Sequence, residues 1–581
     1  MKSYFCGLLA AAFLFLPFPG RTQETGSKTV KTTIHDRVDT RIDNMRYWME
    51  KAEQGLVPYN PDSPPAPAIF KGSRISAAGV KTTNSPDVPV TNLTDVTESE
   101  NSVFIDPANA NYLLNSNNST SWTGSTIGTL YGANYFQSAN AGIAWTGTPT
   151  GAGGSNRGDP TTAIGRNGRE YVNYISSSSG QGIAYSDDGN SWATATVAPN
   201  PGSLADKNHM WIDNKLTSPY EGNLYVAWTD FGGTDDTEIK ISRSVNDGVN
   251  WSTPVNISSA VNAGSHNQGV NLQTGPAGQV YAVWAIYDSW PSDETALGFA
   301  KSLDGGATYS TPTRILSNLK GIRTTGVSKS HRVNSFPSMA VDISGGPNNG
   351  NLYVVWTNIG VPGVNTGTNK SVYISRSVDQ GATWSVPVRV NQGPNTAGKE
   401  AYFPWISCDP ETGTLSVIFY DDRNVSSTQC EVFVAYSTDA GNNWTDFAVS
   451  DVAFTPQGIP GLASNYMGDY LGITSKGGKV YPCWTDTRNG LFMTYVSPFE
   501  LGLNAGFTSS ATVICTGTAV TFTDLSTGPP TTWTWSFPGG TPSAYVGQTP
   551  PPVTYATTGT YDVSLTVTTA SGTDTETKTG F

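Results

Sequence analysis

The sequence has few basic residues, few cysteines and, after its first twenty residues, no long apolar run. Its 581 residues carry 33 Lys and Arg against 46 Asp and Glu, a net charge of −13. Recognition of phosphates needs clustered positive charge, so this balance disfavours a nucleic-acid-binding protein. No later segment approaches the length of apolar sequence that crosses a bilayer, which excludes further membrane spans.

Lys2 and the apolar run from Tyr4 to Phe18 predict a secretory signal peptide over residues 1–22. We therefore expect a secreted or cell-surface protein. Four further cysteines are too few to make a disulfide scaffold in so long a chain, and a bridge between Cys408 and Cys430 is not favoured. The composition is low in charge (14%) and rich in Gly, Pro and aromatic residues, which is typical of all-β proteins.

A repeat of roughly sixty residues runs through the middle of the chain. Each copy contains a short run of β-branched and aromatic residues flanked by turn residues, as in LYVAWTD at 224–230. Runs of this length and composition predict strands. The seven copies lie at 111–118, 169–176, 224–230, 280–288, 352–358, 415–422 and 480–487.

A second motif, S-x-D-x-G-x-[TSN]-[WY], follows most of these runs. It is complete at 302–309, 377–384 and 437–444, and variants lie at 138–145, 185–192 and 244–251. An Asx side chain can accept the N–H groups of its own turn while Gly supplies the positive φ, so the motif predicts a hairpin clasp. We expect a structural role, rather than catalysis or metal binding, for its Asx residues, which we assign as Asp187, Asn246, Asp304, Asp379 and Asp439.

Motif and repeat together resemble the Asp-box (bacterial neuraminidase, BNR) repeat of the sialidase-like β-propellers, over residues 87–500. The resemblance implies an all-β propeller. Seven repeats favour seven blades, and the six blades of true sialidases are the alternative. The segment 87–92 has the pattern of a fourth strand, which the last repeat lacks, so we expect it to close the ring as the outer strand of the last blade.

The two ends of the chain differ from this propeller, which we place at 87–503. Within residues 23–86, apolar residues at helical spacing predict a short amphipathic helix over 36–54, followed by a Pro-rich linker. In the C-terminal part, WTWSFPGG at 533–540 and the strand pattern at 559–567 resemble a PKD domain, an Ig-like β-sandwich. We expect that domain over 504–581, with its last edge strand beyond residue 581.

Candidate binding residues gather on the propeller face opposite the Asp boxes. The triplets Asp421-Asp422-Arg423 and Asp486-Thr487-Arg488 occupy equivalent positions of neighbouring repeats. A guanidinium binds a carboxylate bidentately, which favours recognition of an acidic sugar. A structural latch between Asp and Arg is the alternative. The three histidines on this face lack the close spacing of a metal site.

Sialidases hold the substrate carboxylate with three arginines and use a Tyr–Glu pair as nucleophile and an Asp as acid/base. The resemblance implies Asp159 as the acid/base, Tyr402 or Tyr466 as the nucleophile and Glu400 as its activating carboxylate. The substrate-binding set it implies is Arg332, Arg423 and Arg488, with Arg157 in reserve, beside His266, Asp422 and Asp486. The sequence departs from sialidases in lacking their Arg-Ile-Pro motif.

The leading hypothesis is a sialidase-like glycoside hydrolase acting on acidic or complex glycans. The first alternative is a non-catalytic surface propeller that binds glycan or protein. The second is a polysaccharide lyase on uronate polymers, with His266, Tyr287 and Arg423 at its site. No cofactor is required; the rim carboxylates make calcium an expectation, without a calcium-loop motif. The partner is a glycan or polysaccharide, and the sequence does not report the oligomeric state.

Overall fold

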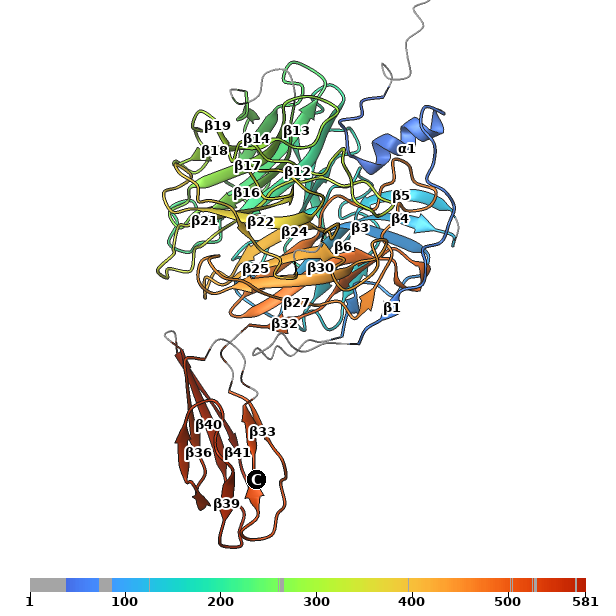
Figure 1. The fold of residues 1–581 in the computed structure, drawn as a ribbon. Helices are drawn as coiled ribbons and strands as arrows, with labels where there is room; N and C mark the ends of the chain where they lie inside the picture. Colours follow the sequence, from blue (N-terminus) through green and yellow to red (C-terminus); the bar gives the residue numbers. More distant parts are fainter. Residues whose placement is uncertain are drawn as a thin grey trace, which may run out of the picture. The chain divides into compact units, whose positions relative to one another are not determined.

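The computed structural model describes residues 38–72, 86–124, 126–259, 261, 266–394, 397–501, 503, 505–524, 526, 530–569 and 572–580. Over these residues the chain is all-β, with a single α-helix, α1 (Met45–Glu53), and a short 3-10 turn, η2 (Arg488–Gly490) (Figure 1). The predicted signal peptide lies outside the described residues. No helix in the described part of the chain combines the length and apolar character needed to cross a membrane.

Seven antiparallel, blade-like sheets of four or five strands build the described residues between 88 and 500. The first three are β3 (Val96–Ile105), β4 (Leu113–Trp122), β6 (Tyr135–Ser138) and β7 (Thr146–Thr148), with β5 (Ile127–Ala133) beside β4; β8 (Thr161–Ile164), β9 (Glu170–Ile175), β10 (Gln181–Ser186) and β11 (Ala193–Ala198); and β12 (Leu204–Ile212), β13 (Leu224–Phe231), β14 (Ile239–Ser244) and β15 (Val255–Asn256).

The next three sheets are β16 (His266–Thr274), β17 (Val280–Tyr287), β18 (Ala296–Ser302) and β19 (Thr313–Ile315); β20 (Ser338–Val341), β21 (Leu352–Ile359), β22 (Lys370–Ser377) and β23 (Val388–Arg389); and β24 (Ala401–Cys408), β25 (Leu415–Asp421), β26 (Glu431–Ser437) and β27 (Thr445–Ala448). The seventh is β29 (Gly472–Lys476), β30 (Lys479–Asp486), β31 (Met493–Val496) and β2 (Val88–Pro89), with β32 (Phe499–Glu500) beside β30.

The seventh sheet joins the two ends of this region. Its outer strand β2 pairs antiparallel with β31, Val88 opposite Val496, although the two strands lie about four hundred residues apart in the chain. The innermost strand of each sheet contacts that of the next, in the order β3, β8, β12, β16, β20, β24 and β29, and β29 contacts β3. The sheets are therefore arranged around an axis, as in a propeller (Figure 1).

Buried tryptophans pack neighbouring sheets against each other. Trp228, Trp284, Trp356 and Trp484 occupy the same position of the LYVAWTD-like runs, on β13, β17, β21 and β30, and each is at most 1% exposed. β-Branched and aromatic neighbours complete the clusters between adjacent sheets. Both faces of these second strands are buried, which explains why they are continuously apolar.

The innermost strands are interrupted by bulges. Register shifts occur in β3, β12, β16 and β24, at or beside residues with positive φ: Glu100 (55°), Lys207 (50°), Gly269 (70°) and Phe403 (56°). A bulge inserts an unpaired residue and re-aims its side chain. Three of these four residues are not glycine, so local strain is maintained at the axis by the surrounding structure.

The S-x-D-x-G motifs form the hairpin clasps that the sequence predicts. In the box at Ser302, the hydroxyl accepts the N–H of Gly306 and donates to Asp304, whose Oδ1 accepts the N–H groups of Ala307 and Thr308. The same carboxylate or amide contact to the turn recurs at Asn140, Asn246, Asp379 and Asp439.

The box of the second repeat corrects one assignment. Asp188, not Asp187, accepts the N–H groups of Asn190 and Ser191, at 2.9 and 2.6 Å. This copy is one residue shorter than the others between its Ser and its Trp, so counting back from the Trp leads to the wrong residue. Asp187 instead forms a bidentate ion pair with Arg169.

The N-terminal segment lies against the sheets. Helix α1 begins at Met45, later than the sequence predicts within 36–54, because the Asn44 side chain caps it by accepting the N–H of Tyr47. Residues 36–37 lie outside the described part. Beyond the helix, Tyr59 bridges to Ala463, and β1 (Ile69–Phe70) pairs with β28 (Val452–Ala453).

The C-terminal part has a core of its own. Trp535, Phe537, Phe522 and Leu565 are buried together. Its strands are β33 (Phe507–Ser509) with β35 (Phe522–Asp524); β34 (Ala519–Val520), β39 (Val553–Tyr555) and β37 (Gly540–Thr541); and β38 (Ala544–Val546), β36 (Thr532–Ser536), β40 (Val563–Thr569) and β41 (Gly572–Lys578).

Replacing Asp188 by Ala should lower the Tm by about 1–3 °C, because two turn N–H groups and the Ser191 hydroxyl lose their acceptor. Replacing Asp187 by Ala removes an exposed ion pair and should leave the Tm nearly unchanged. Calorimetry of both variants tests the assignment; a larger loss for the Asp187 variant would reverse it.

The buried carboxyl of Glu98 should make the stability of the protein depend on pH. Burial raises its pKa to about 7, and the N–H of Thr494 and the amide of Asn134 only partly offset this. The folded state therefore favours the protonated carboxyl. The contribution of this group to the free energy of unfolding is complete below the pKa of Glu98 in the unfolded chain, and it is lost as the pH rises towards 7. Glu98→Gln should raise the free energy of unfolding by about 2 kcal/mol at pH near 8, with little change near pH 4. Urea titrations at both pH values, with exposed Glu500→Gln as control, measure this; equal gains at both values would contradict it.

Candidate functional site

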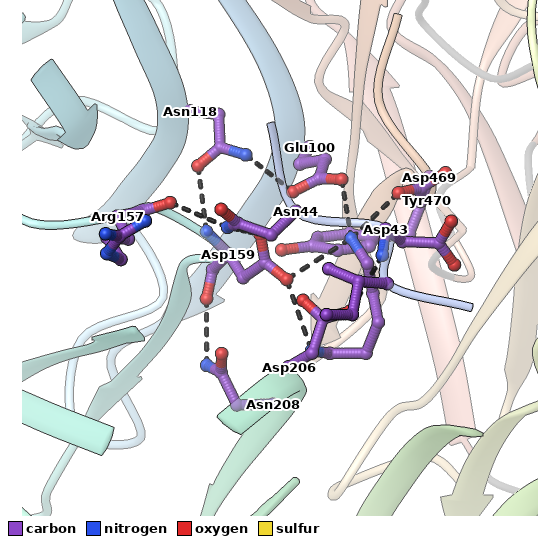
Figure 2. Close-up of polar contacts among 12 residues, drawn as sticks. Asp43, Asn44, Glu100, Asn118, Arg157, Asp159, Asp206, Asn208, Asp469 and Tyr470 are labelled. Atoms are coloured by element: carbon purple, nitrogen blue, oxygen red, sulfur yellow. Dashed lines mark hydrogen bonds and ion pairs between the residues drawn. The ribbon is translucent and has the colours of Figure 1, made fainter. Parts of the chain in front are cut away.

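A buried lysine lies among carboxylates where the innermost strands meet. The Nζ of Lys207 is 2.8 Å from Glu100, 3.2 Å from Asp159 and 2.8 Å from Asp469, and all four side chains are at most 2% exposed. Figure 2 shows Glu100, Asp159 and Asp469 in one group with Asp206. We call these five residues the axial cluster.

The cluster is assembled by strained backbone at the start of the innermost strands. Glu100 on β3 and Lys207 on β12 are bulge residues. Asp159 precedes β8 and also has a positive φ, 58°, while Asp469 follows Gly468, whose φ is 110°. Four different sheets thus direct charged side chains to one point. Strain of this kind concentrates at functional sites.

The electrostatics of the cluster are those of a buried network. Burial raises the pKa of Glu100 well above its usual value, and Lys207 only partly opposes this. Burial lowers the pKa of Lys207, but Asp159, Asp469, Glu100 and Asp206 reverse the effect and hold it well above its usual value. Asp469 has its pKa lowered by Arg332 and Lys207 despite its burial. Lys207 therefore stays cationic and Asp469 anionic at neutral pH.

The N-terminal segment covers the cluster on one side. The Asn44 amide donates to Asp159 Oδ1 (3.3 Å) and to the carbonyl of Arg157 (2.8 Å). The backbone N–H of Asp43 donates to Asp206 at 2.9 Å (Figure 2). The Asn44 side chain and the Asp43 backbone thus contact Asp159 and Asp206, two carboxylates that an open propeller mouth would leave exposed.

On its other side the cluster borders a cavity of about 370 Å³, which we call the axial cavity. Lys207 and Asn208 line its inner end. Its wall contains the aromatic residues Phe104, Trp211, Phe336, Trp405 and Tyr470, together with His209. The lining extends to the loops that follow the innermost strands, including Leu216, which is 70% exposed, so the cavity reaches the surface there.

His209 is a neutral member of this wall. Burial lowers its pKa to about 3, and its Nδ1 accepts the N–H of Leu272 at 3.1 Å. Its ring packs between Trp211 and Trp405, with centroids 6.4 and 5.6 Å away. The histidine therefore lines the axial cavity, next to the bulge at which the register of β12 shifts.

Several sequence-predicted residues lie in or beside the axial cluster. Asp159 is a member. Tyr466 is hydrogen-bonded to Ser99 and Asn118, and the guanidinium of Arg332 lies 5.0 Å from the centroid of its ring. Arg332 also forms a bidentate pair with Asp469. Arg157 is paired with Glu50 of α1 at 2.8 Å.

Glu400, Tyr402 and Asp422 belong to a different buried group. The Nζ of Lys329 lies 2.6 Å from both Glu400 and Asp422. The hydroxyl of Tyr402 is 3.0 Å from Nε2 of His331. Glu400 thus pairs with two lysines, Lys329 and Lys370, and the Nζ of Lys370 lies 2.7 Å from its carboxylate. Among the described residues, no hydrogen bond or ion pair connects Glu400, Tyr402 or Asp422 directly to Asp159 or Tyr466.

The remaining predicted arginines are latched to carboxylates. Arg423 pairs with Asp421 and Asp446, and Arg488 pairs with Asp486 and Asp87. Each pair adjoins its own sheet, so the structure does not bring Arg332, Arg423 and Arg488 into one carboxylate-binding triad. Their contacts are those of the latch alternative.

The lyase residues are only partly brought together. The ring of His266 stacks on Tyr287 with centroids 4.2 Å apart, and Tyr287 donates to Glu294 at 2.8 Å. Arg423 is instead engaged by Asp421 and Asp446. Over the described residues, no group of three or more His, Cys, Asp or Glu side chains could hold a metal ion, so the calcium expectation finds no site there.

Sequence reasoning missed Glu100, Lys207 and the aromatic wall. The available signal was polar sequence inside predicted strands: the runs around Glu100 and Lys207 read TESEN and ADKNH. Charged residues are almost never fully buried unless they are paired. Charged and polar runs within predicted strands, next to apolar repeats, therefore indicate that paired charges are buried where these strands meet.

Lys207→Met should lower the free energy of unfolding by about 3–5 kcal/mol, because it leaves Glu100, Asp159 and Asp469 buried without their shared cation. The matched control Lys479→Met removes a lysine whose side chain is 30% exposed, and should change it by less than about 0.5 kcal/mol. Urea unfolding measures both. A loss below about 1 kcal/mol for the Lys207 variant would show that the network is not cooperative.

Among solved structures, the chain is similar to a protein of unknown function from Dyadobacter fermentans DSM 18053 (12% identity, TM-score 0.41, covering 73% of this chain and 100% of that one). It is also similar to the Hadza microbial sialidase Hz136 (13%, TM-score 0.37, 75% and 98%) and to the GH93 α-L-arabinofuranosidase of Fusarium graminearum (15%, TM-score 0.37, 61% and 98%).

No curated protein matches the chain. The family model of the PKD domain matches residues 504–580, the part of the chain with its own core. The C-terminal part of this protein is therefore a PKD domain.

Proposed function

We propose that this chain is a secreted glycan-binding protein in which residues 87–503 form a closed seven-bladed propeller. The pairing of β2 with β31 and the contact of β29 with β3 support the closure. The predicted signal peptide supports secretion. The glycan enters the axial cavity from the loops that follow the innermost strands. The observation that carries the binding is the aromatic wall of that cavity.

The cavity has the chemistry of a sugar site. Its volume falls in the range of roughly 300–1,000 Å³ typical of small-molecule pockets, and apolar and aromatic side chains dominate its lining. The C–H faces of sugar rings can pack on Trp211 and Trp405, while hydroxyl groups can pair with Asn208 at the inner end.

We favour binding over the hydrolysis that the resemblance implies. Glycoside hydrolysis uses two carboxyl groups that flank the scissile bond. Asp159 and Glu100 are instead paired with Lys207, which separates them from a ligand in the cavity, and Asn44 covers Asp159 on the other side. Glu400 is engaged by two lysines.

Trp405→Ala should weaken glycan binding by at least about tenfold, because it removes one wall of the cavity. Trp444→Ala, an equally large truncation in an Asp box outside the cavity, should leave affinity unchanged. Calorimetric titration of the full chain with oligosaccharides of arabinan, pectin, ulvan and sialylated mucin measures both variants. Equal affinity of the wild type and the Trp405 variant for every bound glycan would refute the cavity as the site.

The same incubations, analysed by anion-exchange chromatography, separate binding from catalysis. Binding without product release supports the proposal as stated. Release of sugar would restore the hydrolase hypothesis, and release of unsaturated products absorbing in the near ultraviolet would restore the lyase hypothesis.

A further inference from the structure

We infer that the segment Thr40–Gln54 occupies a second ligand site, which binds a carboxylate group, and that Asp43 is the built-in occupant of that site. The segment contacts the start of the innermost strands, whereas the axial cavity lies along their middle and end. This site is therefore distinct from the proposed glycan site and does not depend on it.

Asp43 is held as a free carboxylate ligand would be held. Its side chain is fully buried, and both its oxygens accept from the guanidinium of Arg323, Oδ2 at 2.8 Å. The amide of Gln268 donates to the same Oδ2 at 3.1 Å, and Arg332 Nη1 lies 3.8 Å from Oδ1. A bidentate guanidinium with a second cation and an amide is a specific carboxylate clamp.

The clamp is built by the ring of sheets, not by the segment. The backbone N–H of Arg323 is fixed by Glu294, at 3.2 Å, and its guanidinium lies over Trp290. Arg332 is oriented by Asp469 through two hydrogen bonds. These supports remain when Asp43 leaves, so the site is preorganised for an anion.

Asp43 satisfies the site incompletely. Arg332 Nη1 and Asp206 Oδ1 are buried without a hydrogen-bond partner, although each belongs to a side chain that contacts Asp43. One is a donor and the other an acceptor. Buried polar atoms are rarely left unpaired, so the pair indicates a ligand larger than one carboxymethyl group. A sugar acid, which carries a hydroxyl beside its carboxylate, has both complementary groups.

The segment has the connections of a detachable cover. The exposed residues 53–55 lie at the end of its helix, before the next paired residues, Tyr59 and Asn60, which bind Ala463 and Leu462. Its polar contacts to the ring are spread along the segment, from Thr40 to Glu50. Besides Asp43 and Asn44 they include the Arg41–Asp236 and Glu50–Arg157 ion pairs and the Arg46 bond to Leu130. Ligand carboxylate and Asp43 would compete for one clamp, which makes the segment an intramolecular inhibitor.

The test uses the full chain and the variant Asp43→Asn, which keeps the shape of the side chain and removes its charge. The control Asp236→Asn neutralises an aspartate that pairs with Arg41 of the segment and lies outside the clamp. Glucuronate and N-acetylneuraminate are titrated calorimetrically, with glucose at the same ionic strength as the neutral probe. We expect Asp43→Asn to bind a sugar acid at least about tenfold more tightly than the wild type or the control, and Asp43→Asn with Arg323→Met to lose that gain.

No gain in the Asp43 variant, or an equal gain for glucose, would overturn the inference. Should that variant not fold, hydrogen exchange of residues 42–49 in the wild type decides: saturating sugar acid should accelerate it and glucose should not, and equal rates overturn the inference. Trp405→Ala should not alter these results, so failure here is distinguishable from failure of the cavity as the glycan site.

Discussion

The ammonium group of Lys207 is the interaction on which the centre of this molecule depends. It lies within hydrogen-bonding distance of carboxylates from three other sheets, Glu100, Asp159 and Asp469, and all four side chains are at most 2% exposed. Without it the innermost strands would hold like charges together at low dielectric, where repulsion is strong. The bulges that bring these residues to the axis are strained, and the shared cation offsets that strain.

This cluster also divides the axis into two unlike ends. At one end aromatic side chains form the axial cavity, with Lys207 and Asn208 as its inner boundary. At the other end the polar groups face arginines and the N-terminal segment, whose Asp43 and Asn44 complete their hydrogen bonds. One end suits the apolar faces of a neutral ligand and the other suits an anion, and a single layer of ion pairs separates them.

Away from the axis, the sheets are held by hydrogen bonds within turns and by ion pairs between arginine and aspartate. Asp boxes close each hairpin through local hydrogen bonds, and arginine latches such as Arg488 with Asp486 and Asp87 tie the ends of neighbouring segments. The contacts of the boxes join residues of one turn, whereas Arg488 and Asp87 come from the two ends of residues 87–503. Both kinds of contact stabilise the arrangement around the axis but leave its chemistry to the innermost strands.

Local pattern was enough to predict the strands, the box hairpins and the PKD region, because each depends on residues within about ten positions of one another. It failed for Asp188, where one deleted residue shifted the motif, and for the start of α1, which the Asn44 cap sets. The candidate site lay beyond such reasoning. Asp159 could be named as a rim residue, but its meeting with Glu100, Lys207 and Asp43 joins positions far apart in the chain. These residues come together only because the sheets surround an axis and the bulges direct strained residues towards it. The residue spacing within a single repeat predicts neither of these features.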